Sequence, residues 1–446
     1  MTEEIHYKSA ASRWFHQIPD DWHISKLKFL VNIFTGNSLN DGEKLRFSFD
    51  ENPELKGYNY ISSKDIDVGT RMCNYDTGII IPTSETKYKV APSNSTLLCI
   101  EGGSAGKKIT FTTEDVCFVN KLACFKSTET THSKFVYYFL QSNEFKNQFQ
   151  SSLSGLIGGV SLTNLNDFEI PVPPLSEQQK IADFLDRKTT QNDTIIEKKQ
   201  KLLQLLEEKK KSVINEAVTK GLNPNVPMKD SGIEWIGDIP ESWEVSKLGY
   251  LGSFQNGVSK GGDYFGTGYP FVNYGDIYKN FSLPLKVEAL ANSTEEDRIS
   301  YSVEKGDVFF TRTSETIEEI GIASTCLETI PNAVFSGFTI RFRPDLNSSL
   351  FEGFSKYFFR SNYVRISFTK EMNLVTRASL SQTLLKSLTI FLPSLEEQKS
   401  IAKYLDNYEK KFFEVSQKLN FQIEKLKEYR QSIISEAVTG KIAVSN

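Results

Sequence analysis

The chain has 446 residues, of which 39% are hydrophobic and 24% are charged, and its formal net charge is −4. The length exceeds one ordinary hydrophobic core and predicts two or more domains, while the composition is typical of a globular protein. No apolar run approaches the ~18 residues of a membrane span and no signal-peptide pattern opens the sequence, so we expect a cytoplasmic protein.

The sulfur and imidazole side chains give no sign of a metal site. Five cysteines and four histidines are scattered along the chain, and no two cysteines have the CxxC spacing. This distribution argues against a disulfide framework and against a zinc site. The mildly acidic balance does not exclude a nucleic-acid partner, because binding depends on the local field and not on the summed charge.

One stretch of the sequence occurs twice. Residues 170–222 and 390–442 align at a constant offset of 220 without a gap. Both contain Leu-x-Glu-Gln shortly after a proline, and both close on Glu-Ala-Val-Thr. A fixed offset over this length indicates an internal duplication.

Both copies have the spacing of a coiled-coil helix. Their apolar positions alternate by four and three residues, which is a heptad pattern, although polar residues interrupt the first copy. A long helix cannot bury such a stripe alone, so we expect the two copies to pack antiparallel as a spacer of about 60 Å. The expected pairing residues are Ile181, Leu185, Ile195, Leu202, Leu206, Val213, Ile401, Leu405, Phe412, Val415, Leu419, Leu426 and Ile433.

The duplication extends to a strand-rich module in each half. Residues 18–30 and 239–251 share an Ile-Pro-x-x-Trp string, whose Trp22 and Trp243 we expect in the core against the first strand of each half. Further on, residues 94–101 match 305–312 at offset 211, and the apolar runs predict buried strands. The shared positions are apolar and the differing ones are polar. Two recognition modules with different targets would show this pattern, and so would simple divergence of surface loops.

The predicted fold class is therefore α+β. Two mixed α/β modules are joined by two long antiparallel coiled-coil helices, in an internally duplicated and pseudo-twofold arrangement. A stretch with prolines, glycines and no helical period separates the halves. The expected segments are residues 1–169 (first module), 170–221 (first helix), 222–238 (linker), 239–389 (second module) and 390–446 (second helix).

Basic, amide and hydroxyl side chains on predicted loops are candidates for contacting DNA. Lysine and arginine can neutralise phosphates, and arginine and asparagine can pair with base edges in the major groove. Any single one of these residues could instead be an ordinary solvated surface residue. The candidates are Lys64, Lys87, Lys89, Ser104, Lys107, Lys108, Asn120 and Lys121 in the first half, and Asn273, Tyr274, Lys279, Thr311, Arg312, Thr313, Ser314, Arg365, Lys370 and Arg377 in the second.

Catalytic motifs are weak throughout. Residues 103–108 resemble a phosphate loop, but Glu101 and Lys108 break the pattern at its first glycine and its final hydroxyl. Asp76, Glu85 and Lys87 have the order of a metal-dependent nuclease site, a triplet that is frequent by chance in a charged chain. We expect no catalysis, metal or cofactor in this chain. The alternatives are such a nuclease, or a structural coiled-coil protein with two β-rich modules that bind protein or glycan.

The whole arrangement resembles the specificity subunit of type I restriction–modification systems. The resemblance rests on the strings at residues 174–182 (PLSEQQKIA) and 394–402 (SLEEQKSIA), on the two Ile-Pro-x-x-Trp strings, and on the Gly-Asp-Val-Phe string at 306–309. The first module departs from the family pattern, because Ser95 and Thr96 stand where the second has Gly306 and Asp307.

This resemblance implies two target-recognition domains, each of which reads half of a split, asymmetric site in double-stranded DNA. The paired helices would hold these domains and bind two methylation subunits. Those subunits would use S-adenosylmethionine to methylate adenine, and restriction subunits would add cleavage driven by ATP and Mg²⁺. The specificity subunit itself would catalyse nothing, would bind no cofactor and would direct these partners in host defence.

Overall fold

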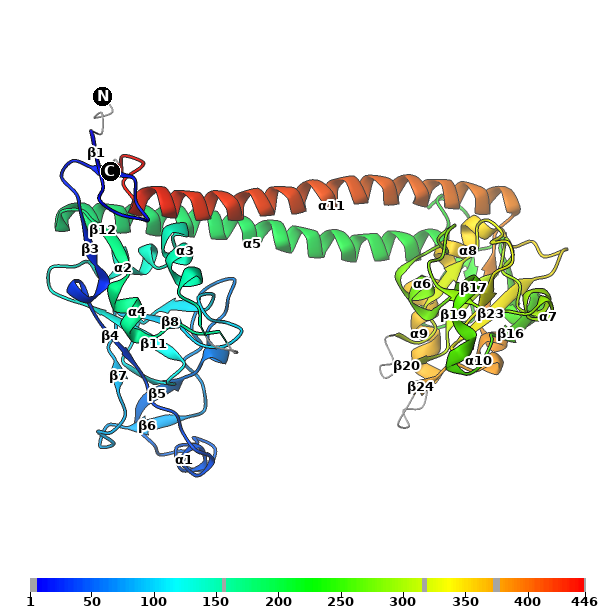
Figure 1. Cartoon of the computed structure of the whole chain (residues 1–446). Coiled ribbons are helices and arrows are strands. Elements are labelled where there is room, and N and C mark those ends of the chain that lie inside the picture. Colours follow the sequence, from blue (N-terminus) through cyan, green and yellow to red (C-terminus); the bar gives the residue numbers. More distant parts are fainter. Residues whose placement is uncertain (1–5, 155–157, 315–318, 372–377, 445–446) are drawn as a thin grey trace. The chain divides into compact units, whose positions relative to one another are not determined.

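A computed structural model of the chain describes residues 6–154, 158–314, 319–371 and 378–444. The chain divides into two compact units, which we call unit 1 (residues 1–200 and 420–446) and unit 2 (residues 201–419). Each unit contains one strand-rich module together with part of each long helix (Figure 1). The compact units therefore differ from the expected segments, which separated modules from helices along the sequence.

The module of unit 1 is built on two four-stranded sheets. In one, the order β4-β11-β8-β9 is antiparallel throughout, and in the other, with order β6-β5-β10-β7, strand β5 runs parallel to β10. Two-stranded pairs β1–β2 and β3–β12 complete the strands described. The strands are β1 (Tyr7–Ser9), β2 (Gln17–Pro19), β3 (His23–Lys26), β4 (Val31–Thr35), β5 (Gly57–Ile61), β6 (Ile80–Pro82), β7 (Val90–Ala91), β8 (Thr96–Cys99), β9 (Ile109–Phe111), β10 (Val116–Phe118), β11 (Leu122–Ser127) and β12 (Glu169–Val172).

Short helices connect and cover these strands. They are η1 (Leu27–Phe29), α1 (Asp41–Arg46), η2 (Ser63–Asp65), α2 (Ser133–Phe139), α3 (Asn143–Ser151) and α4 (Leu162–Asp167). Side-chain caps fix several of their starts. Ser142, for example, accepts a hydrogen bond from the backbone N–H of Phe145 at 3.1 Å and so begins α3.

The module of unit 2 repeats this frame. Its antiparallel sheet has the order β16-β23-β19-β21, and β17 runs parallel to β22 beside β18. Pairs β13–β14 and β15–β25 correspond to the outer pairs of unit 1, and β20–β24 is an additional pair. The strands are β13 (Met228–Asp230), β14 (Asp238–Pro240), β15 (Glu244–Lys247), β16 (Gly252–Asn256), β17 (Phe265–Val272), β18 (Leu290–Ala291), β19 (Val308–Thr311), β20 (Thr313–Ser314), β21 (Ala323–Thr325), β22 (Val334–Phe335), β23 (Thr339–Pro344), β24 (Ala378–Ser379) and β25 (Thr389–Leu392).

The short helices of unit 2 follow the same order along the chain. They are η3 (Leu248–Tyr250), η4 (Gly262–Tyr264), α6 (Tyr274–Lys279), α7 (Glu295–Ser300), α8 (Glu352–Phe358), α9 (Asn362–Glu371) and α10 (Gln382–Ser387). The central strands β8 and β19 are buried at every position, which confirms the buried strands predicted from their apolar runs.

The strand registers correct the expected alignment of the two modules by one residue. Asn94 and Gly306 both adopt the left-handed conformation, with φ of 61° and 93°, in the turns before β8 and β19. Asparagine tolerates this conformation better than most residues, so it can replace glycine here. The true partner of Gly306 is therefore Asn94 and not Ser95. After the strands, Ile100 and Arg312 are equivalent, and each donates its backbone N–H to the residue just before the neighbouring strand.

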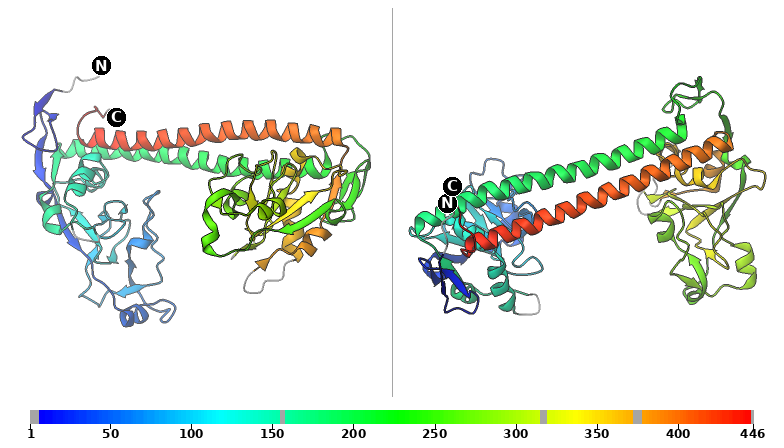
Figure 2. Two further views of the ribbon diagram at one scale, coloured as in Figure 1. Left: turned by 45° about the vertical axis from the view of Figure 1, so that its right-hand side comes forward. Right: turned by 90° about the horizontal axis from the view of Figure 1, so that it is seen from above.

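The two long helices are α5 (Leu175–Lys220) and α11 (Leu395–Val438), with 46 and 44 residues. In unit 1, the Asn192 side chain donates to the Leu426 carbonyl at 3.0 Å, and Lys199 donates to the Gln422 side chain at 2.8 Å. From one contact to the next, the residue number rises in α5 and falls in α11. The helices are therefore antiparallel, as predicted, and lie side by side within the unit (Figure 2). No helix in the described parts of the chain is long and apolar enough to cross a membrane.

The seam between the helices differs from the predicted one at alternate positions. Residues Ile195, Leu202 and Val415 are 43–44% exposed, so their predicted place in the pairing is wrong. The buried or half-buried positions lie one residue further on, where polar residues such as Thr189 and Lys210 occur. The observed seam is Leu185, Thr189, Asn192, Ile196, Lys199, Leu203, Leu206, Lys210, Val213 and Ala217 in α5, with Leu405, Glu409, Phe412, Ser416, Leu419, Ile423, Leu426, Arg430, Ile433 and Ala437 in α11.

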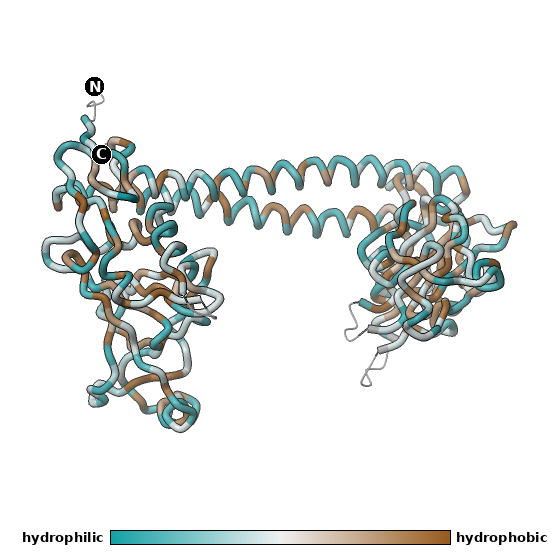
Figure 3. The backbone as a smooth tube through the Cα atoms, viewed as in Figure 1, coloured by the Kyte–Doolittle hydropathy of each residue, from teal (hydrophilic) through white to brown (hydrophobic). Residues whose placement is uncertain are grey.

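Both long helices contribute to the core of each module. In unit 1, Ile181 and Leu185 of α5 and Ile434 of α11 pack in one cluster with the strands, and unit 2 repeats this arrangement. Figure 3 shows apolar residues gathered inside each module and mixed with hydrophilic residues along the long helices. The apolar ends of the helices are therefore continuous with the module cores.

Trp22 and Trp243 mark the point where a long helix ends in each unit. Both are 1% exposed, which confirms the predicted core role. A Cβ atom at Gly440 would lie 3.4 Å from the Trp22 ring, and one at Gly221 would lie 3.3 Å from the Trp243 ring. The two glycines have φ of 72° and 77°, the left-handed conformation that commonly ends a helix. The tryptophans thus pack beside the ends of the long helices.

Candidate nucleic-acid interface

The structure brings four predicted residues of unit 1 together beside η2 and the loop after β8. Lys108 donates to the Ser63 carbonyl at 2.6 Å and lines the same hollow as the exposed Lys64. Lys107 is also exposed and donates to a carbonyl of its own loop at 3.2 Å, while the Ser104 carbonyl accepts the Lys107 backbone N–H. Lys64 and Lys107 are thus accessible cations of this region, although the hollow beside Lys64 also contains the carboxylates of Asp65 and Asp67.

The remaining predicted residues of unit 1 form a second group. The Lys89 backbone N–H donates to the Asn37 side chain at 2.9 Å, and the hydroxyl of the following residue, Ser38, donates to the Asn120 side chain at 2.7 Å. Lys89, Asn120 and Lys121 are exposed. The loop at residues 37–38 therefore connects the segments that carry Lys89 and Asn120.

Lys87 belongs to an ion pair. Its ammonium lies 2.6 Å from a carboxylate oxygen of Glu43 and 4.8 Å from the centre of the Tyr88 ring. The hydrogen bond with Glu43 raises the pKa of Lys87, and the same contact, with the backbone of Asn40 and the Tyr88 hydroxyl, lowers the pKa of Glu43 to about 2. The positive charge of Lys87 is thus largely balanced, which reduces its expected contribution to phosphate binding.

In unit 2, three predicted residues have internal roles. Thr311 is fully buried, and its hydroxyl donates to the Glu319 carbonyl at 2.6 Å, so its predicted contact with DNA is wrong. The Asn273 side chain accepts the Asp276 backbone N–H at 3.0 Å and thereby caps α6. The Tyr274 hydroxyl also donates to the Glu319 carbonyl, at 3.2 Å. Thr311 and Tyr274 thus meet at the Glu319 carbonyl, at a junction of loops.

Arg312 and Thr313 lie at this junction. The Arg312 carbonyl accepts the Leu380 backbone N–H at 2.8 Å, and Thr313 pairs with Ser379 in the β20–β24 ladder. Both side chains are half-buried. The side chain of Ser314 and the whole of Arg377 lie outside the described residues. Arg312 therefore lies at this junction, at the position where unit 1 has Ile100.

The other basic residues predicted in unit 2 are arranged differently. Arg365 donates to the Ile320 carbonyl, so its guanidinium helps to position the turn beside Glu319. The Lys370 ammonium lies 3.6 Å from the centre of the Trp235 ring, a cation–π contact. Lys279 is exposed at the end of α6. Arg365 therefore lies near the junction that carries Arg312, whereas Lys370 packs on a ring of another segment.

The nuclease alternative receives no support from the geometry. Glu85 pairs with Arg46, and Lys87 pairs with Glu43, so both are engaged by α1. Within the described ranges, no group of three or more histidine, cysteine, aspartate or glutamate side chains could hold a metal ion.

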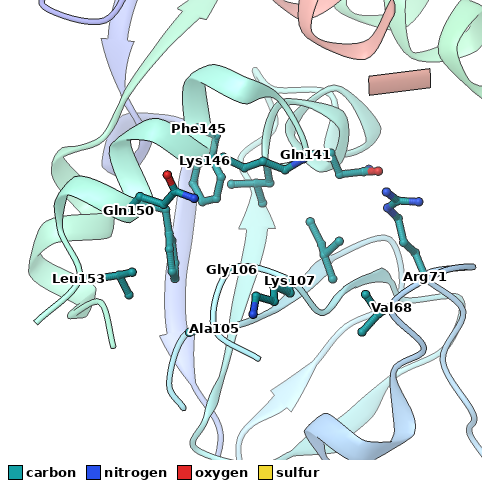
Figure 4. Close-up of a pocket in the computed structure, with 13 residues that line it drawn as sticks. Val68, Arg71, Ala105, Gly106, Lys107, Gln141, Phe145, Lys146, Gln150 and Leu153 are labelled. Atoms are coloured by element: carbon teal, nitrogen blue, oxygen red, sulfur yellow. The ribbon is translucent and has the colours of Figure 1, made fainter. Parts of the chain in front are cut away.

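Two basic residues that the sequence did not single out, Arg71 and Lys146, lie with Lys107 at a cavity of unit 1 (Figure 4). No local motif marks them. One signal could have found Lys146. It is the fourth residue of α3, and Arg365, a predicted candidate, is the fourth residue of α9.

Comparison with known proteins identifies the family. The sequence model of the type I restriction modification DNA specificity domain matches residues 19–205 and 240–425, that is, both modules with parts of both long helices. Among individual relatives, the putative type I restriction enzyme MjaX specificity subunit of Methanocaldococcus jannaschii is 29% identical over 69% of this chain. That match spans 66% of the relative, just under two thirds of its length.

Other relatives match over nearly the whole chain. The MjaVIII specificity subunit of the same archaeon is 25% identical over 99% of this chain and 98% of its own length, and the EcoKI specificity subunit of Escherichia coli K12 is 21% identical over 96% and 90%. A chain from a structural study of complex assembly and conformational transition of the type I R-M system has a TM-score of 0.71 at 16% identity, covering 95% of this chain and 99% of that one. The HsdS subunit from Thermoanaerobacter tengcongensis has a TM-score of 0.54 at 17% identity, covering 95% and 98%. This chain therefore belongs to the type I restriction modification DNA specificity domain family.

Proposed function

We propose that this chain is the specificity subunit of a type I restriction–modification complex, and that each unit reads one half of a two-part, asymmetric DNA sequence. One observation carries the proposal beyond family membership. The same strand frame occurs twice, yet the residue that follows its central strand is Ile100 in unit 1 and Arg312 in unit 2. An arginine can pair with a guanine edge in the major groove and an isoleucine cannot, so the two units would read different bases.

The chain would act through partners. We infer that it directs two methylation subunits and, in the full complex, restriction subunits. It would bind no cofactor itself, and S-adenosylmethionine, ATP and Mg²⁺ would belong to those partners. Exposed apolar side chains on the long helices support a partner surface, because large apolar groups in water favour association. They include Ile195, Leu202, Phe413, Val415, Phe421 and Tyr429. The complex would work in the cytoplasm, where it meets chromosomal and incoming DNA.

A methylation map tests this function. The chain is co-expressed with its methylation subunit in a host that lacks adenine methylation, and the modified adenines are located by sequencing the host DNA. Methylation in a two-part motif with a fixed unspecified gap is the expected result. Assembly of the complex without any modified adenine would instead favour a structural interaction protein that carries two binding modules.

A further inference from the structure

A cavity of about 350 Å³ opens in unit 1 between the loop after η2, the loop after β8 and helix α3 (Figure 4). This volume falls within the range of sites that bind small molecules. Apolar side chains form part of its wall, with the buried rings of Phe145 and Phe149 among them. The lining residues are Val68, Arg71, Ala105, Gly106, Lys107, Ile109, Leu140, Gln141, Phe145, Lys146, Phe149, Gln150 and Leu153.

The charge of this cavity is positive. Arg71, Lys107 and Lys146 come from three separate segments, and the described residues of the lining include no carboxylate. Arg71 adopts the left-handed conformation, with φ of 61°, which non-glycine residues rarely adopt. The chain thus accepts an uncommon backbone geometry at a residue that lines the cavity.

The cations of this region lie close enough to disfavour one another. Burial, together with the charges of Arg71 and Arg430, lowers the pKa of Lys146 to about 8. Burial and the charge of Arg430 likewise lower the pKa of Arg71. The nearby carboxylate of Asp193 is already paired with Arg430 at 2.9 Å. A bound anion would relieve this repulsion, because an opposite charge favours the protonated form of each cation.

The equivalent region of unit 2 has larger side chains at two positions. Gly106 and Gly321 have φ of 71° and 68°. A Cβ atom at Gly106 would meet the Phe149 ring of α3, and one at Gly321 would meet the Phe368 ring of α9. These glycines are therefore equivalent, and the residues before them are Ala105 and Ile320. Ala105 is half-buried at the cavity, whereas the larger Ile320 is fully buried.

A second pair of equivalent positions gives the same contrast. Residue 141 follows α2 as residue 360 follows α8, and it is glutamine in unit 1 and arginine in unit 2. The Arg360 guanidinium donates to the carbonyls of Ile277 at 2.9 Å and Asn280 at 2.6 Å, which ties α8 to α6. Unit 2 thus has larger side chains than unit 1 at both positions.

We propose that this cavity binds the phosphate group of a nucleotide unit, which Arg71, Lys107 and Lys146 would hold while the attached sugar or base rests on the wall formed by Phe149 and Leu153. Charge-assisted hydrogen bonds from arginine and lysine are the strongest contacts that proteins make to phosphate. The phosphate could come from a free mononucleotide or from a DNA backbone. The inference does not depend on which bases unit 1 reads. For a backbone phosphate it rests on the proposed function, which the methylation map tests separately.

Calorimetric titration of the full chain, in complex with its methylation subunits, tests the proposal with three probes. They are deoxyadenosine 5′-monophosphate, the dinucleotide TpT as a backbone phosphodiester, and deoxyadenosine as the phosphate-free control. At least one phosphate ester is expected to bind more tightly than deoxyadenosine by about tenfold or more. Tighter binding of the monophosphate identifies a free nucleotide, and tighter binding of TpT identifies a backbone.

Three substitutions connect that binding to the cavity. Arg71→Gln and Lys146→Gln each remove one cation and should weaken the phosphate ester about tenfold. Ala105→Ile introduces the side chain of unit 2 and should weaken it to a similar extent. Lys126→Gln removes an exposed lysine outside the lining and should leave binding within about twofold.

Equal binding of nucleoside and nucleotide would overturn the proposal, as would affinities unchanged in both Arg71→Gln and Lys146→Gln. These two variants decide the result even where Ala105→Ile disturbs the fold, because Arg71 and Lys146 are only half-buried.

Discussion

Units 1 and 2 share a strand frame but differ in what they bury inside it. In unit 2, Asp307 is 1% exposed and receives two hydrogen bonds from the Arg343 guanidinium, at 2.6 and 2.7 Å. Burial raises the pKa of the Asp307 carboxyl, and Arg343 opposes that change. Unit 1 has Ser95 and Lys126 at the equivalent strand positions, with the serine buried and the lysine exposed. One frame can therefore be held together with or without a buried ion pair.

The long helices show a second contrast at equivalent places in the seam. Arg430 is buried in unit 1 and pairs with Asp193, whereas Lys210 in unit 2 lies 3.3 Å from Glu409 and 4.8 Å from the centre of the Phe412 ring. At this pair of equivalent positions, each unit thus admits a cation into its seam and neutralises it differently. The periodic positions are the same, and the polar contacts are particular to each unit.

Lengthening both helices equally should have the largest effect on function. Repeating residues 194–200 in α5 and 413–419 in α11 adds one heptad to each helix and leaves the seam of both units in register. Seven residues add about 10.5 Å, or about three base pairs of DNA. We expect the methylated motif to gain a gap longer by about three base pairs, as measured by a methylation map.

The matched control carries the insertion in α11 alone, which puts the two helices out of register and should abolish methylation. An unchanged gap in the double insertion would show that the helices do not set the spacing of the two half-sites.

Breaking the ion pair between Arg343 and Asp307 should destabilise unit 2 and leave the stability of unit 1 unchanged. Arg343→Ala leaves Asp307 buried without its partner, and removing one member of a buried pair costs about 3–5 kcal/mol. Hydrogen exchange should therefore accelerate in β19 and β23, while β8 and β11 of the same molecule keep their protection. Lys126→Ala at the equivalent exposed position should change protection by less than about 0.5 kcal/mol. Similar losses in the two variants would contradict this comparison.

Removal of the seam cation should destabilise unit 1 more than unit 2. Arg430→Ala removes charge-assisted hydrogen bonds worth about 1.5–3 kcal/mol, although the 46% exposed Asp193 can then be solvated. Lys210→Ala should cost only about 0.5–1 kcal/mol, because Glu409 also lies 3.5 Å from Lys356. Exchange protection of α11 near each site measures both losses. If Lys210→Ala proved the more damaging, the seam of unit 2 would depend on its cation more than these contacts suggest.

The sequence predicts the features that repeat and misses those that depend on one tertiary contact. The offset of 220, the helical periodicity and the buried apolar strands all follow from local pattern. The prediction of the seam is wrong at Ile195 and Leu202 because these residues are apolar and near the right spacing, whereas Thr189 enters the interior through a hydrogen bond that only the folded chain supplies.

The errors at the candidate site have the same physical origin. Asparagine at position 94 performs the backbone role of a glycine, which no comparison of side-chain types reveals. The cavity of unit 1 joins residues as distant as Arg71 and Lys146, and no single stretch of sequence contains both. Thr311 was placed at the surface because it is polar, yet its hydroxyl is satisfied inside the module.

The substitution that is most informative about recognition is that of Arg312, because its expected effect is confined to one half-site. Arg312→Ala should weaken binding at the half-site read by unit 2 by about 1–3 kcal/mol if the arginine pairs with a base edge. The measurement compares the partner complex on duplexes altered in one half-site at a time. Ile100→Ala at the equivalent position removes no hydrogen-bonding group and should leave the half-site preference of unit 1 unchanged. An equal loss on every duplex after Arg312→Ala would mean that the guanidinium contacts phosphate alone, because the backbone is the same in all of them.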